Sequence, residues 1–128
     1  MSVKEILHTE LAPAAVGPYS QAVITGNLIF TSGQIALDPN TGKIESDTIE
    51  GQTEQVMHNL HCVLAEGGVA FDRVIKTTCF LADMNDFAAF NEVYGKYFPE
   101  NPPARSCVQA AALPKGAKVE IEVIAVKG

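Results

Sequence analysis

The sequence is poor in basic residues and has none of the long apolar runs that cross membranes. Nine Lys and Arg stand against 15 Asp and Glu in 128 residues, and the formal charge at pH 7 is −6. Because a nucleic-acid backbone attracts basic proteins, this balance argues against a general nucleic-acid-binding surface. No run approaches the roughly 20 apolar residues of a membrane span, and the N-terminus does not resemble a signal peptide. We therefore expect a cytoplasmic protein without a membrane partner.

Cysteine is scarce as well, and its spacing excludes the common cysteine-based scaffolds. Cys62, Cys79 and Cys107 are odd in number and form no C-x-x-C pair, so neither a disulfide framework nor a zinc ribbon is indicated. His58 and His61 can share a helix face, but no third ligand follows a known pattern, and we expect no metal site. The sequence also lacks G-x-G-x-x-G, P-loop and G-x-S-x-G motifs, which leaves nucleotide binding and the usual serine-hydrolase route without support.

What is present is the composition of a folded domain. Hydrophobic residues make up 47% of the chain and charged residues 19%, far from the balance of disordered proteins. A chain of this length is the usual size of one domain, and no linker or repeat divides it. We predict a single domain over residues 1–128.

Hydrophobic periodicity predicts strands and two helices. Runs rich in β-branched and aromatic residues predict strands at residues 21–24, 28–35, 74–81, 104–111 and 117–126. Apolar residues three, four and seven apart predict a helix that starts at Asp47, with Glu50 at its capping-box position, and stops at Gly67. A second helix, capped by Asn85 or Asp83, follows and must end near Pro99.

These elements predict an α+β fold, a single mixed sheet with two helices packed on one face. Each helix has one apolar face, so both should lie together against the sheet. The last predicted strand is apolar on both of its faces, and one layer of helices covers only one of them. We therefore expect other subunits to cover the second face.

Arg105 is the sharpest candidate for a functional residue. It follows Pro102 and Pro103 at the start of an apolar strand, where its planar guanidinium needs a partner. A carboxylate could accept two parallel, charge-assisted hydrogen bonds from it. The residues leave two alternatives open: a ligand carboxylate, or a protein acid such as Glu120 or Glu122.

Glu120 and Glu122 are two apart in the last predicted strand and so point to the same face. A partly buried glutamate there would have a raised pKa and could hold or deprotonate a water molecule. By themselves, the residues favour an exposed acidic pair on an edge strand.

Other candidate positions also have plain structural explanations. Tyr19 and Ser32 place polar groups beside apolar runs, and Gly33 interrupts a strand, as at a β-bulge. Cys107 lies near Arg105, but no histidine is placed to serve it, so a packed thiol is favoured over a nucleophile. The aromatic residues of the second helix, among them Phe87, are expected in the core.

Four separated motifs resemble the RidA/YjgF family of reactive-intermediate deaminases. The most specific is P-A-R-S-C-V-Q-A-A-A-L at residues 103–113, followed by V-E-I at residues 119–121. The segments A-P-A-A-V-G-P-Y-S-Q-A, F-T-S-G-Q-I and D-M-N-D-F, at residues 12–22, 30–35 and 83–87, are similar to the family too.

The resemblance implies a chorismate-mutase-like homotrimer with a central barrel and clefts shared between subunits. It implies cofactor-free hydrolysis of 2-aminoacrylate and related enamines or imines, including 2-iminopropanoate and 2-iminobutanoate, to 2-oxo acids and ammonia. Arg105 would bind the substrate carboxylate, and Glu120 would position water with help from backbone groups at Cys107. The cleft would be lined by Tyr19, Ser32, Gly33, Phe87 and Asn91.

Two other functions remain as alternatives. Some relatives are described as ribonucleases or translation inhibitors, although the charge of −6 disfavours RNA binding. A non-catalytic protein that binds small carboxylic acids, such as 2-oxo acids, is the second alternative. Binding without turnover would separate it from an enzyme.

Overall fold

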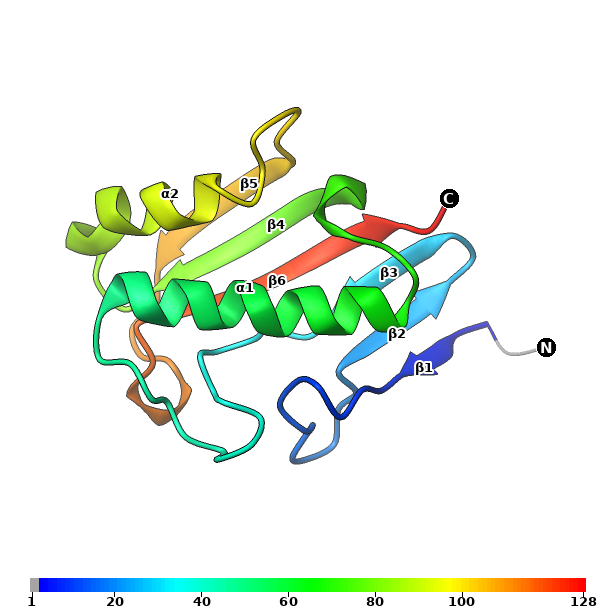
Figure 1. Cartoon of the computed structure of the whole chain (residues 1–128), viewed down its shortest axis with the longest axis horizontal. Coiled ribbons are helices and arrows are strands. Elements are labelled where there is room, and N and C mark those ends of the chain that lie inside the picture. The colour runs from blue at the N-terminus through cyan, green and yellow to red at the C-terminus, as the bar shows by residue number, and fades with distance from the viewer. Residues whose placement is uncertain (1–2) are drawn as a thin grey trace.

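The computed structural model describes residues 3–128, which form one six-stranded sheet with two α-helices (Figure 1). The sheet order is β1-β2-β3-β6-β4-β5, and every neighbouring pair is antiparallel except β4 and β5. The strands are β1 (Glu5–Leu7), β2 (Ala22–Thr25), β3 (Leu28–Thr31), β4 (Val74–Leu81), β5 (Ala104–Gln109) and β6 (Val119–Val126). The helices are α1 (Ile49–Glu66) and α2 (Phe87–Gly95), with short 3-10 helices η1 (Phe71–Arg73), η2 (Met84–Asp86) and η3 (Pro114–Gly116).

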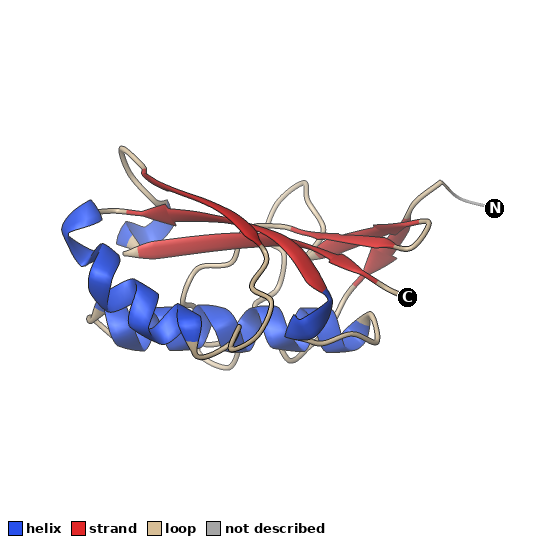
Figure 2. Cartoon of the chain, turned by 90° about the horizontal axis from the view of Figure 1, so that it is seen from above, coloured by secondary structure: helices blue, strands red, loops and turns tan. Residues whose placement is uncertain are grey.

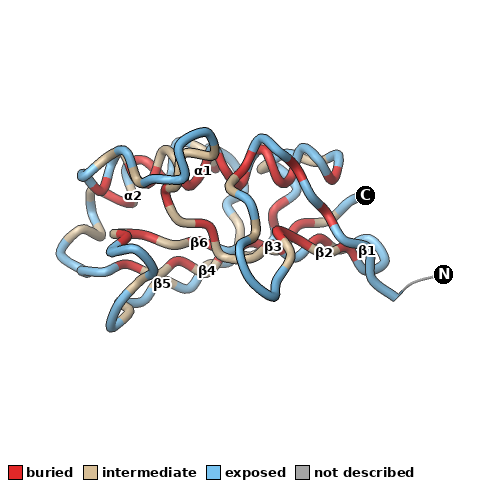
Figure 3. The backbone as a smooth tube through the Cα atoms, turned by 90° about the horizontal axis from the view of Figure 1, so that it is seen from below, coloured by how far each residue is buried: buried red, intermediate tan, exposed pale blue. Residues whose placement is uncertain are grey.

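Both α-helices lie on the same face of the sheet, as Figure 2 shows from the edge. The apolar stripe of α1, which includes Val56, Leu60 and Leu64, is completely buried, and Val119 and Ile121 of β6 belong to the same core. Figure 3 shows buried segments in both the helical layer and the sheet. Helix α1, with a period of 3.6 residues, and strand β6, with a period of two, thus bury their apolar faces in the same layer. The predicted α+β fold, a mixed sheet with two helices on one face, is confirmed. Neither of these helices is long and apolar enough to cross a membrane, nor is any other helix in residues 3–128.

Several element boundaries differ from the predictions. Helix α1 is capped by Thr48, whose hydroxyl accepts from the Gly51 N–H, so the predicted Asp47 cap and its capping box with Glu50 are wrong. Asp83 caps the short η2 that precedes α2, by accepting from the Asn85 N–H. The N-cap of α2 itself is Asp86, whose side chain makes no capping hydrogen bond, so neither predicted cap holds for the second α-helix. Strand β1 was not predicted, because three residues are too few to show a period.

The predicted strand at residues 28–35 is interrupted where Gly33 suggested a bulge. Strand β3 ends at Thr31, and an isolated bridge between Gln34 and Ile121 resumes the pairing with β6. Phe30 and Gln34 are four positions apart, but their partners Ile124 and Ile121 are only three positions apart. One residue is therefore extra on the β3 side, and the chain bows away from the sheet there.

The second face of the sheet carries no helix in the described chain and exposes several apolar side chains beside polar ones. Phe30, Ile75 and Val108 are 37%, 48% and 48% exposed on their three strands. Ile124 and Val126 of β6 are partly exposed between them. Exposed apolar side chains on four neighbouring strands can mark an interaction surface, so the expectation that other subunits cover this face stands as a prediction.

Candidate functional site

Arg105 lies on the helix-covered side of edge strand β5, against the inner face of α2. Its Nη1 donates a hydrogen bond of 2.7 Å to Asn91 Oδ1. Its Cζ lies 5.4, 5.9 and 5.0 Å from the ring centroids of Phe87, Phe90 and Tyr94. All these distances fall within the range of cation–π attraction. The guanidinium is thus held by three rings and one uncharged acceptor, a set of four residues that we call the neutral cradle.

The cradle exists because the chain crosses over between two parallel strands. Strands β4 and β5 run side by side in register, and η2 and α2 connect them across the helix side (Figure 1). Phe87, Asn91 and Tyr94 follow one another at intervals of about one turn along α2, so all three can face β5. A hollow of about 410 Å³ opens beside Arg105 and is lined by Asn91, Tyr94, Gly95, Phe98, Pro102, Pro103 and Arg105.

Arg105 has no acidic partner within the described chain. The ion pairs among residues 3–128 join His8 to Glu10 and Lys96 to Glu54. The alternative of a salt bridge from Arg105 to Glu120 or Glu122 in the same chain is therefore wrong. A half-buried cation without a counter-charge is poised to bind an anion from outside.

Cys107 lies two residues beyond Arg105 and points to the same side of β5. Burial raises the pKa of its thiol, and the opposing effect of Arg105 is smaller. The thiol therefore stays protonated at neutral pH, which supports a packed thiol over a nucleophile. Cys62 and Cys79 are likewise free thiols, and both are buried.

A second group of predicted residues surrounds a larger hollow of about 700 Å³. Its lining includes Tyr19, Ser32, Gly33, Glu120 and Glu122. Tyr19 is 53% exposed, and its hydroxyl accepts a hydrogen bond of 3.4 Å from the Val16 N–H. The Ser32 hydroxyl donates to the Ser20 carbonyl over 2.6 Å, which ties the two loops together. We call Tyr19, Ser32, Gly33 and Glu120 the glutamate half-site, and Arg105 with Cys107 and its cradle the arginine half-site.

Gly33 is needed here for space. A Cβ atom at this position would overlap the carboxylate of Glu120. The missing side chain lets the bowed segment after β3 pass directly over the acid. The strand interruption read from the sequence thus shapes the hollow around Glu120.

Glu120 is partly buried in the middle of the sheet. Strand β6 pairs with β3 on one side and β4 on the other, so the expected acidic pair on an edge strand is wrong. Burial raises the pKa of Glu120, and the neighbouring charge of Glu122 raises it further. A carboxylate with a raised pKa is a better base when it is ionised, as proton transfer from water requires.

The two half-sites lie on opposite faces of the sheet in one chain. Arg105 is in register with Thr77 of β4, which is buried under the helices. Glu120 is in register with Phe80, three residues further along β4. Residues an odd number apart on a strand point to opposite sides. The structure thus brings Phe87, Asn91 and Arg105 together, and separately Tyr19, Ser32, Gly33 and Glu120.

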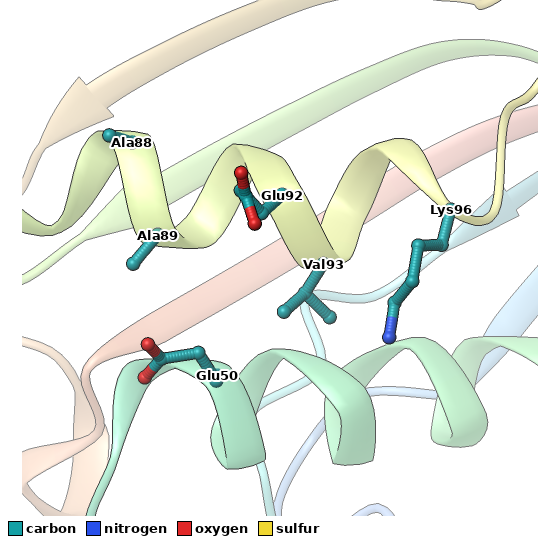
Figure 4. Close-up of a pocket in the computed structure, with 6 residues that line it drawn as sticks. All are labelled: Glu50, Ala88, Ala89, Glu92, Val93 and Lys96. Carbon is teal, nitrogen blue, oxygen red and sulfur yellow. The ribbon is translucent and has the colours of Figure 1, made fainter.

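A third hollow, between α1 and α2, contains none of the predicted residues. It is lined by Glu50, Ala88, Ala89, Glu92, Val93 and Lys96 (Figure 4). Lys96 reaches across to Glu54 of α1, 3.0 Å away, and Tyr97 donates to the same carboxylate. This region joins the two helices and offers no carboxylate-binding group free of a partner. Within residues 3–128, no group of three His, Cys, Asp or Glu is arranged to hold a metal ion.

Sequence reasoning missed the residues behind Arg105. Tyr94 lies in the core, as expected of the aromatic residues of the second helix, but its contact with Arg105 was not predicted. No feature of the sequence distinguishes Thr77 from its neighbours in the strand. Helical spacing places Tyr94 near Asn91, but only the strand register shows that Thr77 lies beside Arg105. No local motif reports such a long-range register.

Comparison with known proteins gives a consistent result. The family model described as "Endoribonuclease L-PSP" matches residues 9–127. A relative from Arabidopsis thaliana, "Reactive Intermediate Deaminase A, chloroplastic", is 54% identical over 95% of this chain and 65% of its own longer sequence. The human "2-iminobutanoate/2-iminopropanoate deaminase" is 44% identical over 98% of this chain and 92% of its own.

A solved structure agrees in fold as well as in sequence. Escherichia coli TdcF, crystallised with bound serine, superimposes with a TM-score of 0.92 and is 44% identical, covering 97% of this chain and 99% of its own. Matches over nearly the whole chain account for the four motifs and for the sheet with two helices on one face. The chain belongs to the RidA/YjgF family of reactive-intermediate deaminases.

Proposed function

We propose that this protein hydrolyses enamines and imines of small 2-amino acids to 2-oxo acids and ammonia. The expected substrates are 2-aminoacrylate with its tautomer 2-iminopropanoate, and 2-iminobutanoate. Such intermediates escape from pyridoxal-phosphate enzymes and can inactivate others, so their removal would be protective. Two relatives whose names describe deaminases of this kind support the proposal.

One observation carries the proposal: the guanidinium of Arg105 has a built site and no counter-charge. Its cradle supplies rings and an amide, and every substrate named above carries a carboxylate that could complete the pair. Two parallel hydrogen bonds from a guanidinium fix both the position and the plane of a carboxylate. TdcF, which was solved with bound serine, is a relative that accepts an amino acid.

The complete site would combine half-sites from two protomers. Because Arg105 and Glu120 lie on opposite faces, one chain cannot apply both to one small substrate. Strand β5 is a sheet edge, so its residues can border a neighbouring protomer. We propose a chorismate-mutase-like homotrimer in which the helix-free sheet faces form a central barrel, and each cleft joins one arginine half-site to one glutamate half-site.

The chemistry requires few groups. Protonation of the enamine on carbon gives an iminium ion, and Glu120 accepts a proton from water as the water oxygen bonds to the iminium carbon. The resulting carbinolamine is protonated on nitrogen, and the C–N bond breaks as the hydroxyl gives up its proton, which leaves ammonia and the 2-oxo acid. Holding the carboxylate on Arg105 makes the addition of water effectively unimolecular, and Glu120 can shuttle the protons because its pKa is raised.

The test follows ammonia and 2-oxo acid while a threonine dehydratase generates the enamine. The wild-type protein should accelerate release above the uncatalysed background, and Arg105→Ala should remove the acceleration. Arg73→Ala is the matched control, because Arg73 lies exposed in η1 and lines neither half-site. Its rate should equal that of the wild type.

Two results would contradict the proposal. Folded wild-type protein that gives no acceleration, yet binds 2-oxobutanoate through Arg105, would be a carboxylate-binding protein and not an enzyme. Equal acceleration by Arg105→Ala would show that the carboxylate anchor lies elsewhere.

A further inference from the structure

Behind the arginine half-site lies a buried hydroxyl pair that the proposed chemistry does not use. Tyr94 OH and Thr77 Oγ1 are 2.8 Å apart, and the two residues are 6% and 0% exposed. The pair joins α2 to β4 through the core. Burial raises the pKa of Tyr94, so its phenol remains neutral and hydrogen-bonded at physiological pH.

The pair also controls where the ring of Tyr94 sits relative to Arg105. Of the three rings in the cradle, Tyr94 lies closest to the guanidinium, at 5.0 Å. Thr77 and Arg105 are register partners on the parallel strands β4 and β5. The hydroxyl of Thr77 therefore fixes the far end of the same ring whose face attracts Arg105, and all three residues form a closed triangle.

We infer that Thr77 and Tyr94 are positioning residues that hold the Arg105 guanidinium in the orientation that receives the substrate carboxylate. The inference rests on the proposed function for the identity of the ligand, but the positioning itself is a property of the free protein. A salt bridge would also have oriented Arg105, yet it would have neutralised the charge. A neutral ring anchored by a neutral hydroxyl orients the cation and leaves its charge available.

A positioning role and a purely structural role predict different behaviour in a double variant. Thr77→Val leaves the Tyr94 hydroxyl buried without its partner, which destabilises the fold. Adding Tyr94→Phe removes the second hydroxyl, so stability should largely return. Positioning should not return, because the ring has lost its anchor in both variants.

The first readout needs no substrate. The Nε–Hε signal of Arg105, assigned by its loss in Arg105→Lys, should be shifted by the nearby aromatic rings in the wild-type NMR spectrum. We expect that shift to decrease in Thr77→Val, in Tyr94→Phe and in the double variant, and to be retained in Thr77→Ser. An unchanged signal in the folded double variant would overturn the inference, whether or not the protein proves to be a deaminase.

The second readout measures ligand affinity and turnover. Tyr94→Leu should weaken 2-oxobutanoate binding and raise KM by roughly three- to thirty-fold, the range that a cation–π contact supports. The double variant should raise KM by a smaller factor with kcat within about twofold of wild type, because the ring remains nearby. Thr77→Ser should restore wild-type values.

Tyr97→Phe is the matched control, since it removes a tyrosine hydroxyl that bonds Glu54 and not the Arg105 triangle. It should leave both the NMR signal and KM unchanged. If the double variant recovers stability together with a wild-type KM and NMR signal, the pair is structural only and the inference fails. If the NMR signal behaves as expected but wild-type protein shows no turnover, the positioning stands and the deaminase proposal falls.

Discussion

The two half-sites hold opposite charges in opposite ways. Arg105 is supported by groups without charge, three rings and the amide of Asn91, and keeps its full attraction for an anion. Glu120 is partly buried and lies near a second acid, Glu122. Both effects raise its pKa and so disfavour its charged form. The first arrangement suits a group that must bind, and the second suits a group that must exchange protons.

The supports also differ in kind. The arginine half-site is built on helix α2 and on strand β5, which pairs with β4. The glutamate half-site is bounded by loops around residues 13–21 and by the bowed segment after β3. A rigid support suits Arg105, because the substrate carboxylate must stay fixed. A loop-lined hollow suits Glu120, because water must enter and ammonia must leave there.

The largest effect is expected from inactivating one half-site in one chain and the other half-site in a second chain. Arg105→Ala and Glu120→Ala should each be inactive, and mixing the two unfolded chains before refolding should restore activity. If subunits mix at random and each cleft takes one half-site from each of two protomers, about a quarter of the clefts carry both intact residues. Ammonia release by the mixture measures the recovery, and each variant refolded alone is the control. A mixture that stays inactive although mixed oligomers form would show that the half-sites do not meet between protomers.

Glycine substitution should distinguish the loop-lined half-site from the helical one. Gly33→Ala places a Cβ against the Glu120 carboxylate and should lower kcat/KM on the order of a hundredfold, because displacing a catalytic group by an ångström has effects of that size. Gly95→Ala, at the end of α2, lies in the lining of the hollow beside Arg105 but meets nothing within 4 Å, so it provides the comparison from the arginine half-site. It should change kcat/KM far less than Gly33→Ala does and gain a little stability. Steady-state kinetics and thermal unfolding measure both; normal activity in Gly33→Ala would remove Glu120 from the mechanism.

Local patterns in the sequence were enough to predict most of the secondary structure. Periodicity located both α-helices and most strands, because their apolar faces repeat within short windows. The interruption at Gly33 was visible too, because a glycine inside an apolar run is itself a local signal. The cap of α1 was misplaced by one residue, since Asp47 and Thr48 are both good caps and only the backbone decides between them.

The site itself was predictable only in part, because its residues meet through pairing between distant strands. Arg105 was conspicuous as one cation in an apolar strand, but its lack of an acid partner depends on which face it occupies. The central position of β6, which removes Glu120 from the edge, depends on pairing with both β3 and β4. Register between segments many residues apart leaves no local signature, so Thr77 and Tyr94 could not be distinguished from other core residues.

Replacing the neutral acceptor of the cradle with a charged one should weaken ligand binding by roughly tenfold or more. Asn91→Asp would put a carboxylate where Asn91 Oδ1 now accepts from Arg105, and the new ion pair would compete with the ligand. Asn91→Ala removes the acceptor without adding charge, and its smaller effect provides the comparison. Calorimetric titration with 2-oxobutanoate measures both. Equal losses in the two variants would mean that the neutrality of the cradle is unimportant.

The smallest effect is expected from removing the charge of Glu122 beside Glu120. Glu122 raises the pKa of Glu120, as a secondary cause after burial, so Glu122→Gln should lower that pKa. Activity requires the ionised form and falls as the pH drops through the pKa of Glu120. The acid limb of kcat/KM should therefore move to lower pH, with the neutral-pH rate unchanged. Glu66→Gln, an exposed change of the same charge on α1, should leave the profile in place. An acid limb that stays fixed in Glu122→Gln would assign the titration to another group, and Glu120→Gln would then retain that limb in its residual activity.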